Sequence, residues 1–240
     1  QLLALAAEIL GNRQDAELYA GVHRQAAQDF AANFFTLDGA MTAQTQTAHI
    51  LALRFGLTPQ KWKQKTIQRL LELLEQQNGH LVTGFLGTPY FCAALSQNGC
   101  WQQAYDLLLK KDYPGWLYQV LQGATTVWEQ WWERGDMASH NHGMFGGGGT
   151  FFIRNLLGLR QVEDGCRRVV IRPCKTHRLL EAEGALHTVR GEYRIAWRRA
   201  DGERRLTVTV PFGCEAAVQL PDGSQRTVTA GTHTFTCADD

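Results

Sequence analysis

The residues best suited to catalysis and ligand binding lie between Gln122 and His142, in the run QGATTVWEQWWERGDMASHNH. Four of the seven tryptophans of the chain fall between positions 116 and 132. The acidic and hydrogen-bonding side chains among and after them are Glu129, Glu133, His140, Asn141 and His142. Indole faces cover the apolar C–H face of a sugar ring, polar side chains bind its hydroxyls, and a carboxylate can transfer protons. The stretch is therefore typical of a sugar site. The alternative is that the tryptophans pack a helical core and the glutamates form a solvated face.

The composition limits the class of protein. The chain has 240 residues, of which 44% are hydrophobic and 20% charged, with a net charge of +1, so one large or two ordinary domains can each bury a core. The near balance of charge predicts no nucleic-acid partner and no anionic membrane surface. No apolar run approaches the ~20 residues that a membrane span needs, and we expect no signal peptide. Six cysteines without CxxC spacing favour reduced thiols in a cytoplasmic protein, although the spacing leaves a disulfide open.

The elements that must position these residues are predicted to be helices in the first part of the chain. Apolar spacing predicts helices over about 2–10, 15–35, 44–55 and 60–77, followed by two shorter ones near 89–97 and 100–110. We expect Tyr19, Val22, Ala26, Phe30, Asn33 and Phe34 to form a buried face of the second helix. Gly11-Asn12, Gly56 and Asn78-Gly79 end helices, and Thr58-Pro59 is expected to cap and start the fourth. Such hairpins stack as a bundle, a solenoid or an (α/α) toroid.

The period then changes from helical to alternating near Gly165. Runs rich in β-branched and aromatic residues predict strands at 168–172, 190–199, 205–210, 217–220 and 232–236. Asp201-Gly202 and Asp222-Gly223 are hairpin turns, because both pairs tolerate positive φ. Short strands with tight turns predict an antiparallel β-sandwich. The Gly146 to Gly149 run between the two halves is either a helix start pressed against a neighbour or a ligand, or a flexible turn. We place the boundary near 157–166 and assign 1–160 to a helical domain and 161–240 to the sandwich.

Several runs resemble the C-terminal part of bacterial α-L-rhamnosidases, a family of inverting glycoside hydrolases. They are Thr45-Gln-Thr-Ala48, GFLGTPY at 84–90, DYPGWLY at 112–118, GATTVWE at 123–129 and Asn141-His142, together with 169–173 and 208–211 in the sandwich. The resemblance covers nearly the whole chain. It implies a partial (α/α)6 toroid with a sugar site in its mouth, followed by a β-sandwich.

The resemblance also implies roles for particular residues. Glu129 aligns with the family's general base, which activates water on the face opposite the leaving group, and His142 aligns with a histidine that contacts the sugar. Inversion needs two carboxyl groups ~6.5 to 9.5 Å apart, which leaves room for that water. Glu133 is expected to be an exposed helix charge. Trp116 and Trp128 are either sugar platforms or packing residues.

Two departures from the family pattern matter. The family's general acid lies in a motif of the DxxxRDERxGW type, which does not occur here. The helices account for about half of a twelve-helix toroid, and the link from Glu129 to Asn141-His142 is shorter than usual in the family. We therefore expect a fragment of a longer enzyme, inactive alone, with terminal α-L-rhamnose of glycosides or polysaccharides as substrate. The alternative is a non-catalytic carbohydrate-binding or structural remnant that lacks the acid.

The remaining candidates are weaker. His140 and His142 are two residues apart but have no third metal ligand, so we predict neither metal nor cofactor. Asp38 and His49 are candidate rim residues of the sugar site, or simply helix-end residues. The arginines at 190, 194, 198 and 199 are expected to form a solvated face of the sandwich. A half-toroid leaves apolar helix faces uncovered, so we also expect the chain to self-associate.

Overall fold

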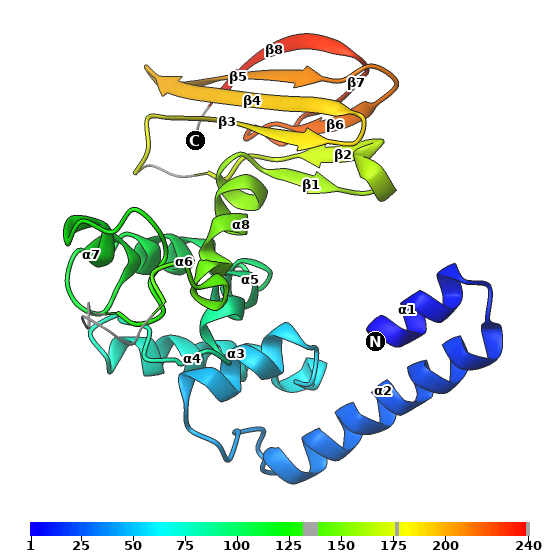
Figure 1. Ribbon diagram of the computed structural model, residues 1–240, viewed down its shortest axis with the longest axis vertical. Helices are drawn as coiled ribbons and strands as arrows, with labels where there is room; N and C mark the ends of the chain where they lie inside the picture. The colour runs from blue at the N-terminus through cyan, green and yellow to red at the C-terminus, as the bar shows by residue number, and fades with distance from the viewer. Residues whose placement is uncertain (132–138, 176–177, 239–240) are drawn as a thin grey trace. The chain divides into compact units, whose positions relative to one another are not determined.

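The computed structural model describes residues 1–131, 139–175 and 178–238 (Figure 1). The chain forms two compact units, Gln1–Gly146 and Gly147–Asp240. The first is helical and the second consists mainly of strands, so the predicted fold class is confirmed. Within the described residues, no helix combines the length and the apolar character that crossing a membrane requires. In the structure all six cysteines carry free thiols.

The first unit is built from helices that pack in consecutive pairs, α1 with α2, α3 with α4 and α5 with α6, and α3 also packs against α5. Figure 1 shows the short α1 alongside the long α2. The α-helices are α1 Leu2–Ile9, α2 Arg13–Phe34, α3 Gln46–Arg54, α4 Lys63–Glu75, α5 Phe91–Ser96, α6 Trp101–Leu108 and α7 Trp116–Leu121. The 3-10 turns η1 Gln60–Trp62 and η2 Thr88–Tyr90 precede α4 and α5.

Most helix ends follow the predicted local chemistry. Gly56 has a φ of +67°, and Asn78 and Gly79 have φ values of +53° and +71°, so α3 and α4 end where the left-handed conformation is available. The Thr45 hydroxyl accepts the Ala48 N–H at 3.2 Å and caps α3. The predicted cap at Thr58 is wrong. Its hydroxyl is buried and makes no hydrogen bond to any described residue, because the chain enters η1 through Pro59.

The predicted buried face of α2 is also wrong. Among the described residues of α2 none is buried, and Val22 and Phe34 are 58% and 45% exposed. Near the C-terminal end of α2, Phe30 and Ala31 pack against Phe35, Met41 and Ala52. The helix therefore has the apolar pattern of a buried face, but the described residues leave that face partly or fully exposed. The leucines and the isoleucine of α1 are exposed in the same way, with Leu2 at 82%, and Leu10 directly after the helix is also 82% exposed.

The glycine run at 146–149 belongs to a helical segment, which decides between the two predicted alternatives in favour of a helix start. The segment consists of η3 Gly143–Gly148, a single α-helical turn α8 Gly149–Phe151 and the π-helical turn η4 Phe152–Leu156. A Cβ added at Gly146 or Gly149 would meet nothing within 4 Å. Close packing therefore does not explain these two glycines.

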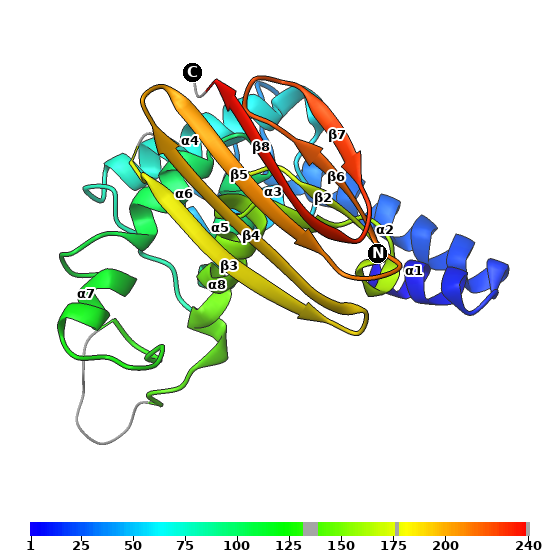
Figure 2. The ribbon, with the colours of Figure 1, turned by 90° about the horizontal axis from the view of Figure 1, so that it is seen from above.

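The second unit is a sandwich of two four-stranded sheets. The sheet with order β3-β4-β5-β8 is antiparallel throughout, and Figure 2 shows its strands side by side. The other sheet has the order β1-β2-β6-β7. The strands are β1 Leu159–Gln161, β2 Arg168–Ile171, β3 Glu181–Thr188, β4 Gly191–Ala200, β5 Glu203–Val210, β6 Glu215–Gln219, β7 Gln225–Val228 and β8 Gly231–Ala238. Asp201 and Gly202, with φ values of +54° and +78°, form the predicted β4–β5 turn.

The second sheet departs from the antiparallel expectation at one pair. β2 and β6 run parallel, with Val169 beside Ala216 and Ile171 beside Val218. Strands that are neighbours in sequence usually pair antiparallel through a hairpin, but these two are separated by the whole of β3, β4 and β5. Strands β1, β3 and β7 were not predicted from the sequence.

The sandwich core contains one buried cation. Arg204 is 1% exposed, and its guanidinium lies 4.6 Å from the centre of the Trp197 ring and donates to the Cys174 carbonyl oxygen at 2.7 Å. Trp197 is 2% exposed and donates from Nε1 to the Leu156 carbonyl oxygen at 2.8 Å. These contacts give Arg204 Nη1 and Trp197 Nε1 an acceptor within the core, and the indole ring lies beneath the buried charge. Burial raises the pKa of the Cys174 thiol to about 11, so the thiol is neutral and does not balance the arginine charge.

Candidate functional site

The predicted site stretch folds back on itself. Glu129 N donates to the Ser139 carbonyl oxygen at 2.9 Å, and His142 N donates to the Val127 carbonyl oxygen at 2.8 Å. The Thr126 hydroxyl also donates to the His140 carbonyl oxygen. Residues 126–129 and 139–142 are thus tied together by main-chain hydrogen bonds. This pairing brings Glu129 and His142, which are distant in sequence, onto two adjacent segments.

The Glu129 carboxylate is held by the same pairing. Ser139 N donates to Glu129 Oε2 at 2.8 Å, so the residue both donates to Ser139 and accepts from it. The side chain is half-buried. Within the described part of the chain its second oxygen, Oε1, has no hydrogen-bond partner. A carboxylate with one oxygen anchored to a backbone N–H and the other unoccupied can orient and deprotonate a water molecule.

A series of aromatic contacts supports the His142 side of the site. Each ring contacts the next one in the series Phe91, Trp116, Trp131, Phe145, His142 and Phe85. The His142 ring centroid lies 5.1 Å from that of Phe85 and 5.9 Å from that of Phe145. His142 Nδ1 is buried and finds no hydrogen-bond partner among the described residues. The ring is therefore fixed by apolar and aromatic packing rather than by a polar partner.

The two tryptophans whose role was left open are both engaged in packing. Trp116 stacks on Phe91 with ring centroids 4.9 Å apart, meets Trp131 edge-on and donates from Nε1 to the Phe145 carbonyl oxygen at 2.8 Å. Trp128 is 6% exposed and stacks on the exposed His140 at 5.5 Å. Most of the surface of each indole is covered, which favours the packing role over the platform role.

The other candidate residues lie in different surroundings. Glu133 is outside the described residues. Asn141 is exposed and belongs to the pairing of 126–129 with 139–142. Hydrogen bonds from Lys65 and Thr36 lower the pKa of the exposed Asp38 to about 2, which is consistent with a structural ion pair that orders the turn after α2.

His49 is not a rim residue. It is 1% exposed, and its Nδ1 lies 2.9 Å from the Thr45 carbonyl oxygen one helical turn earlier. Burial lowers the pKa of its imidazole, so the neutral ring donates Nδ1–H to that carbonyl. Helix α3 buries the face that carries His49 together with its apolar residues. His49 is therefore a core residue.

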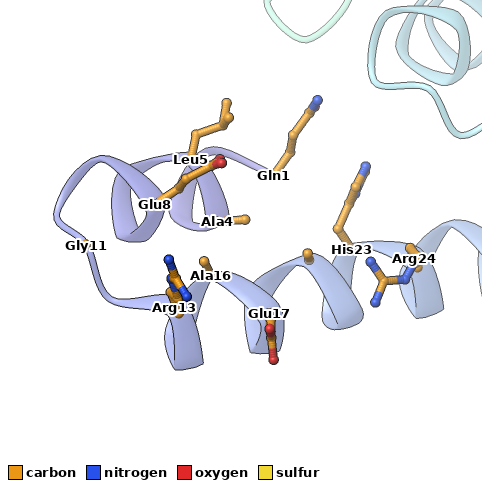
Figure 3. A pocket seen from close by; sticks show the side chains of 11 residues that line it. Gln1, Ala4, Leu5, Glu8, Gly11, Arg13, Ala16, Glu17, His23 and Arg24 are labelled. Atoms are coloured by element: carbon orange, nitrogen blue, oxygen red, sulfur yellow. The ribbon is translucent and has the colours of Figure 1, made fainter.

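A separate hollow of about 940 Å³ lies between α1 and α2 (Figure 3). It is lined by Gln1, Ala4, Leu5, Glu8, Gly11, Arg13, Ala16, Glu17, Ala20, His23 and Arg24. Its charged side chains do not converge: in Figure 3, Glu17 points away from α1. None of the lining residues belongs to the 122–145 stretch. The hollow follows from the uncovered faces of two helices, and we assign it no part in the chemistry.

Sequence reasoning missed several residues of the site. Ser139 orients Glu129 through its backbone N–H, which any residue except proline supplies, so its identity carries no signal. Phe85 contacts His142, and Phe145 links His142 to Trp131 and Trp116. A signal existed for Phe85, because it lies within the GFLGTPY run, but the run alone does not reveal which ring it meets.

Two family models together match almost the whole chain. The model described as the bacterial alpha-L-rhamnosidase 6 hairpin glycosidase domain matches residues 1–156, and the one described as the bacterial alpha-L-rhamnosidase C-terminal domain matches residues 158–235. An alpha-L-rhamnosidase of Alteromonas sp. is 36% identical over 222 residues, which are 88% of this chain and 24% of the relative. One of Formosa agariphila is 31% identical and covers 98% of this chain and 26% of the relative.

Solved structures give the same result. The Streptomyces avermitilis alpha-L-rhamnosidase complexed with L-rhamnose is 30% identical, with a TM-score of 0.89, and the match covers 98% of this chain and 25% of that chain. The Aspergillus terreus enzyme is also 30% identical, with a TM-score of 0.91, and the match covers 98% of this chain and 29% of that chain. The chain thus spans about a quarter of the length of the relatives that it matches.

Proposed function

The chain belongs to the bacterial α-L-rhamnosidases, a family of glycoside hydrolases, and from this membership we propose that it forms part of an inverting enzyme. That enzyme removes terminal α-L-rhamnose from glycosides or polysaccharides. Glu129 is the general base that activates water, and His142 binds the sugar. Whole-enzyme activity further requires a general acid from a part of the enzyme that these 240 residues do not supply.

The observation that carries the proposal is the anchored carboxylate of Glu129. Its Oε2 accepts the Ser139 N–H at 2.8 Å, which fixes the direction in which the other oxygen points. A general base must be held within hydrogen-bond reach of the water that it deprotonates, and a fixed carboxylate costs less entropy to place than a mobile one. His142 forms the hydrogen bond to the sugar through Nε2, because Nδ1 is buried by the protein.

The stereochemistry of the product tests the proposal directly. A polypeptide that contains this chain and cleaves an aryl α-L-rhamnoside is expected to release β-L-rhamnose first. A water molecule activated by Glu129 attacks the anomeric carbon from the face opposite the leaving group. The anomeric proton signals in early ¹H NMR spectra, recorded before mutarotation, distinguish the two anomers. If α-L-rhamnose appears first, the reaction retains configuration and Glu129 does not act as proposed.

The 240-residue chain alone is expected to bind L-rhamnose without hydrolysing an aryl rhamnoside. It carries the proposed base and the sugar-contacting histidine, but no recognised acid to protonate the leaving oxygen. Release of the aryl group, followed by absorbance, measures turnover, and chemical-shift changes on adding L-rhamnose measure binding. Turnover at the rate of a complete family member would place an acid within these residues, and Glu133 is the first that we would then substitute.

Self-association of the chain is a second expected property. Leu2 and Ile9 of α1, and Leu10 directly after it, are 80 to 82% exposed, and Val22 and Phe34 are exposed on α2. Uncovered apolar helix faces associate because association removes them from water. Sedimentation velocity should therefore show an average mass that rises with concentration, and Ile9→Lys with Leu10→Lys should reduce this rise. A monomer across the whole concentration range would contradict the expectation.

The cytoplasmic location stays a prediction, which rests on the reduced cysteines.

A further inference from the structure

A buried histidine outside the proposed sugar contacts joins three segments of the first unit. His80 lies after α4 and is 6% exposed. Its Nδ1 lies 2.8 Å from the Pro114 carbonyl oxygen, and its Nε2 lies 3.0 Å from Asp112 Oδ2. On the other side, Gln46 of α3 donates from Nε2 to the His80 carbonyl oxygen at 3.0 Å. His80 therefore connects α3 and the end of α4 to the 112–114 segment.

Both neighbours of the ring are hydrogen-bond acceptors. A carbonyl oxygen has no proton to give, and neither has an ionised carboxylate. The pKa of the Asp112 carboxyl is lowered, mainly by the hydrogen bond from His80 and to a smaller extent by a hydrogen bond from the Asp112 backbone. This carboxyl is therefore ionised across the neutral range. A neutral imidazole carries a single N–H and can satisfy only one of the two acceptors. Both contacts are made only when both ring nitrogens carry a proton.

The charged groups around the ring are consistent with a cation there. Asp112 contacts it, and Lys110 on the same segment directs its ammonium group to the Asn78 carbonyl oxygen at 2.7 Å. The contact from α3 comes through Gln46, which is uncharged and also accepts the Val82 N–H at 2.9 Å. A buried imidazolium paired with one carboxylate and one carbonyl has both of its donors satisfied.

The 112–114 segment is linked to the proposed sugar site by direct contacts. Pro114 is followed by Gly115 and by Trp116, the first residue of α7. Trp116 Nε1 donates to the Phe145 carbonyl oxygen at 2.8 Å, and Phe145 N donates to the His142 carbonyl oxygen at 3.2 Å. The Phe145 ring also contacts the His142 ring. A shift of the 112–114 segment would therefore move Trp116 and, through Phe145, the histidine.

We propose that His80 is a positioning residue that acts as an imidazolium, tying the 112–114 segment in place so that Trp116 and Phe145 hold His142 in its sugar-binding position. Loss of one ring proton breaks one of its two hydrogen bonds and loosens the segment. The protonation state rests on the local geometry alone, whereas the link to sugar binding rests on the proposed function.

The protonation state is tested by long-range ¹H–¹⁵N NMR of the histidine side chains of the 240-residue chain, with His80→Gln used to assign the signal. At neutral pH, Nδ1 and Nε2 of His80 should both carry protons and show the similar ¹⁵N shifts of an imidazolium. In Asp112→Asn the side-chain amide can donate as well as accept, so a single neutral tautomer of the ring can satisfy both contacts and should appear. A single neutral tautomer in the wild-type chain at neutral pH would overturn the proposal.

The positioning role is tested by the pH profile of L-rhamnose affinity in the wild-type chain and in the variants. We expect the wild-type chain to bind roughly fivefold more weakly once the His80 ring has lost a proton, the equivalent of about one hydrogen bond. His80→Gln should bind weakly across the whole profile, and the same spectra follow the His142 ring separately. The indole N–H signal of Trp116 verifies that the variant is folded, and Asp112→Asn serves as the milder variant if it is not.

The outcomes separate the two claims. Wild-type affinity and an unchanged pH profile in both folded variants would refute the positioning role. Absence of L-rhamnose binding by the wild-type chain at every pH would count against the proposed function and would remove the sugar link with it. The NMR measurement would still decide whether His80 is an imidazolium.

Discussion

Glu129→Gln is expected to lower kcat by ~10² to 10⁴-fold in an active polypeptide that contains this chain. Glutamine keeps the size of the side chain and can still accept the Ser139 N–H, so the loop geometry is preserved while the base is lost. Water must then attack without proton abstraction. The loss should appear mainly in kcat, because the sugar contact of His142 persists. The initial rates of aryl rhamnoside hydrolysis measure it.

Two comparisons make this result specific. Glu75→Gln changes an exposed carboxylate on α4 and should leave both kcat and KM unaltered. His142→Ala removes a hydrogen bond worth about 1 to 3 kcal/mol and should raise KM, lower kcat, or both. The acidic limb of the pH profile reports the base of an inverting enzyme, so it should flatten in Glu129→Gln while the alkaline limb remains. More than about a tenth of wild-type kcat in this variant would mean that Glu129 is not the base.

Trp197→Ala is expected to lower the free energy of unfolding of the sandwich by about 3 to 5 kcal/mol. The substitution empties the space of a 2% exposed indole. It also leaves the Leu156 carbonyl oxygen without the Nε1 donor and removes the ring beneath the Arg204 guanidinium. Each loss adds to the cavity cost, because a buried polar group without a partner keeps its full desolvation penalty.

Native-state hydrogen exchange of the β4 and β5 amides measures this effect in the 240-residue chain, since the two units need not unfold together. Trp197→Phe keeps a ring beneath the arginine but lacks the N–H, and it should cost less than the alanine. A loss below about 1 kcal/mol for Trp197→Ala, within the range of an ordinary surface change, would show that the core does not depend on this residue.

Local chemistry explains the parts of the fold that the sequence predicts correctly. The helix ends at Gly56 and Asn78-Gly79 depend on positive φ, and the Asp201-Gly202 turn depends on the same property, so each is encoded by one or two residues. The strands with alternating apolar residues, such as β5, were found for the same reason: the pattern is contained in the segment.

The elements that were missed take their structure from partners elsewhere. β3 contains Glu181, Glu183 and Gly184, which have low strand preference, and it is a strand because all of it pairs with β4. β7, QRTV, is largely exposed and has no apolar alternation. The prediction for α2 fails in the opposite direction: its apolar spacing predicts a buried face, but no residue of α2 is buried by the part of the chain that the structure describes.

The candidate site divides in the same way. Glu129 and His142 were identified through the resemblance to the family, because its motifs preserve their neighbours in sequence. The hydrogen bond from Ser139 N to Glu129, and the series of rings that ends at Phe85, involve residues brought together by folding. His80 had no distinguishing signal at all. Its two acceptors, Asp112 and the Pro114 carbonyl oxygen, lie far along the chain.

The parallel pairing of β2 with β6 determines the order in which the sandwich can assemble during synthesis. β3, β4 and β5 can pair as each leaves the ribosome, because neighbours in the chain are neighbours in that sheet. β2 has only β1 beside it until β6 emerges, so the other edge of β2 stays unpaired over that interval. Nascent chains that stop between Val210 and Glu215 therefore present an unpaired strand edge, and such edges are prone to aggregation.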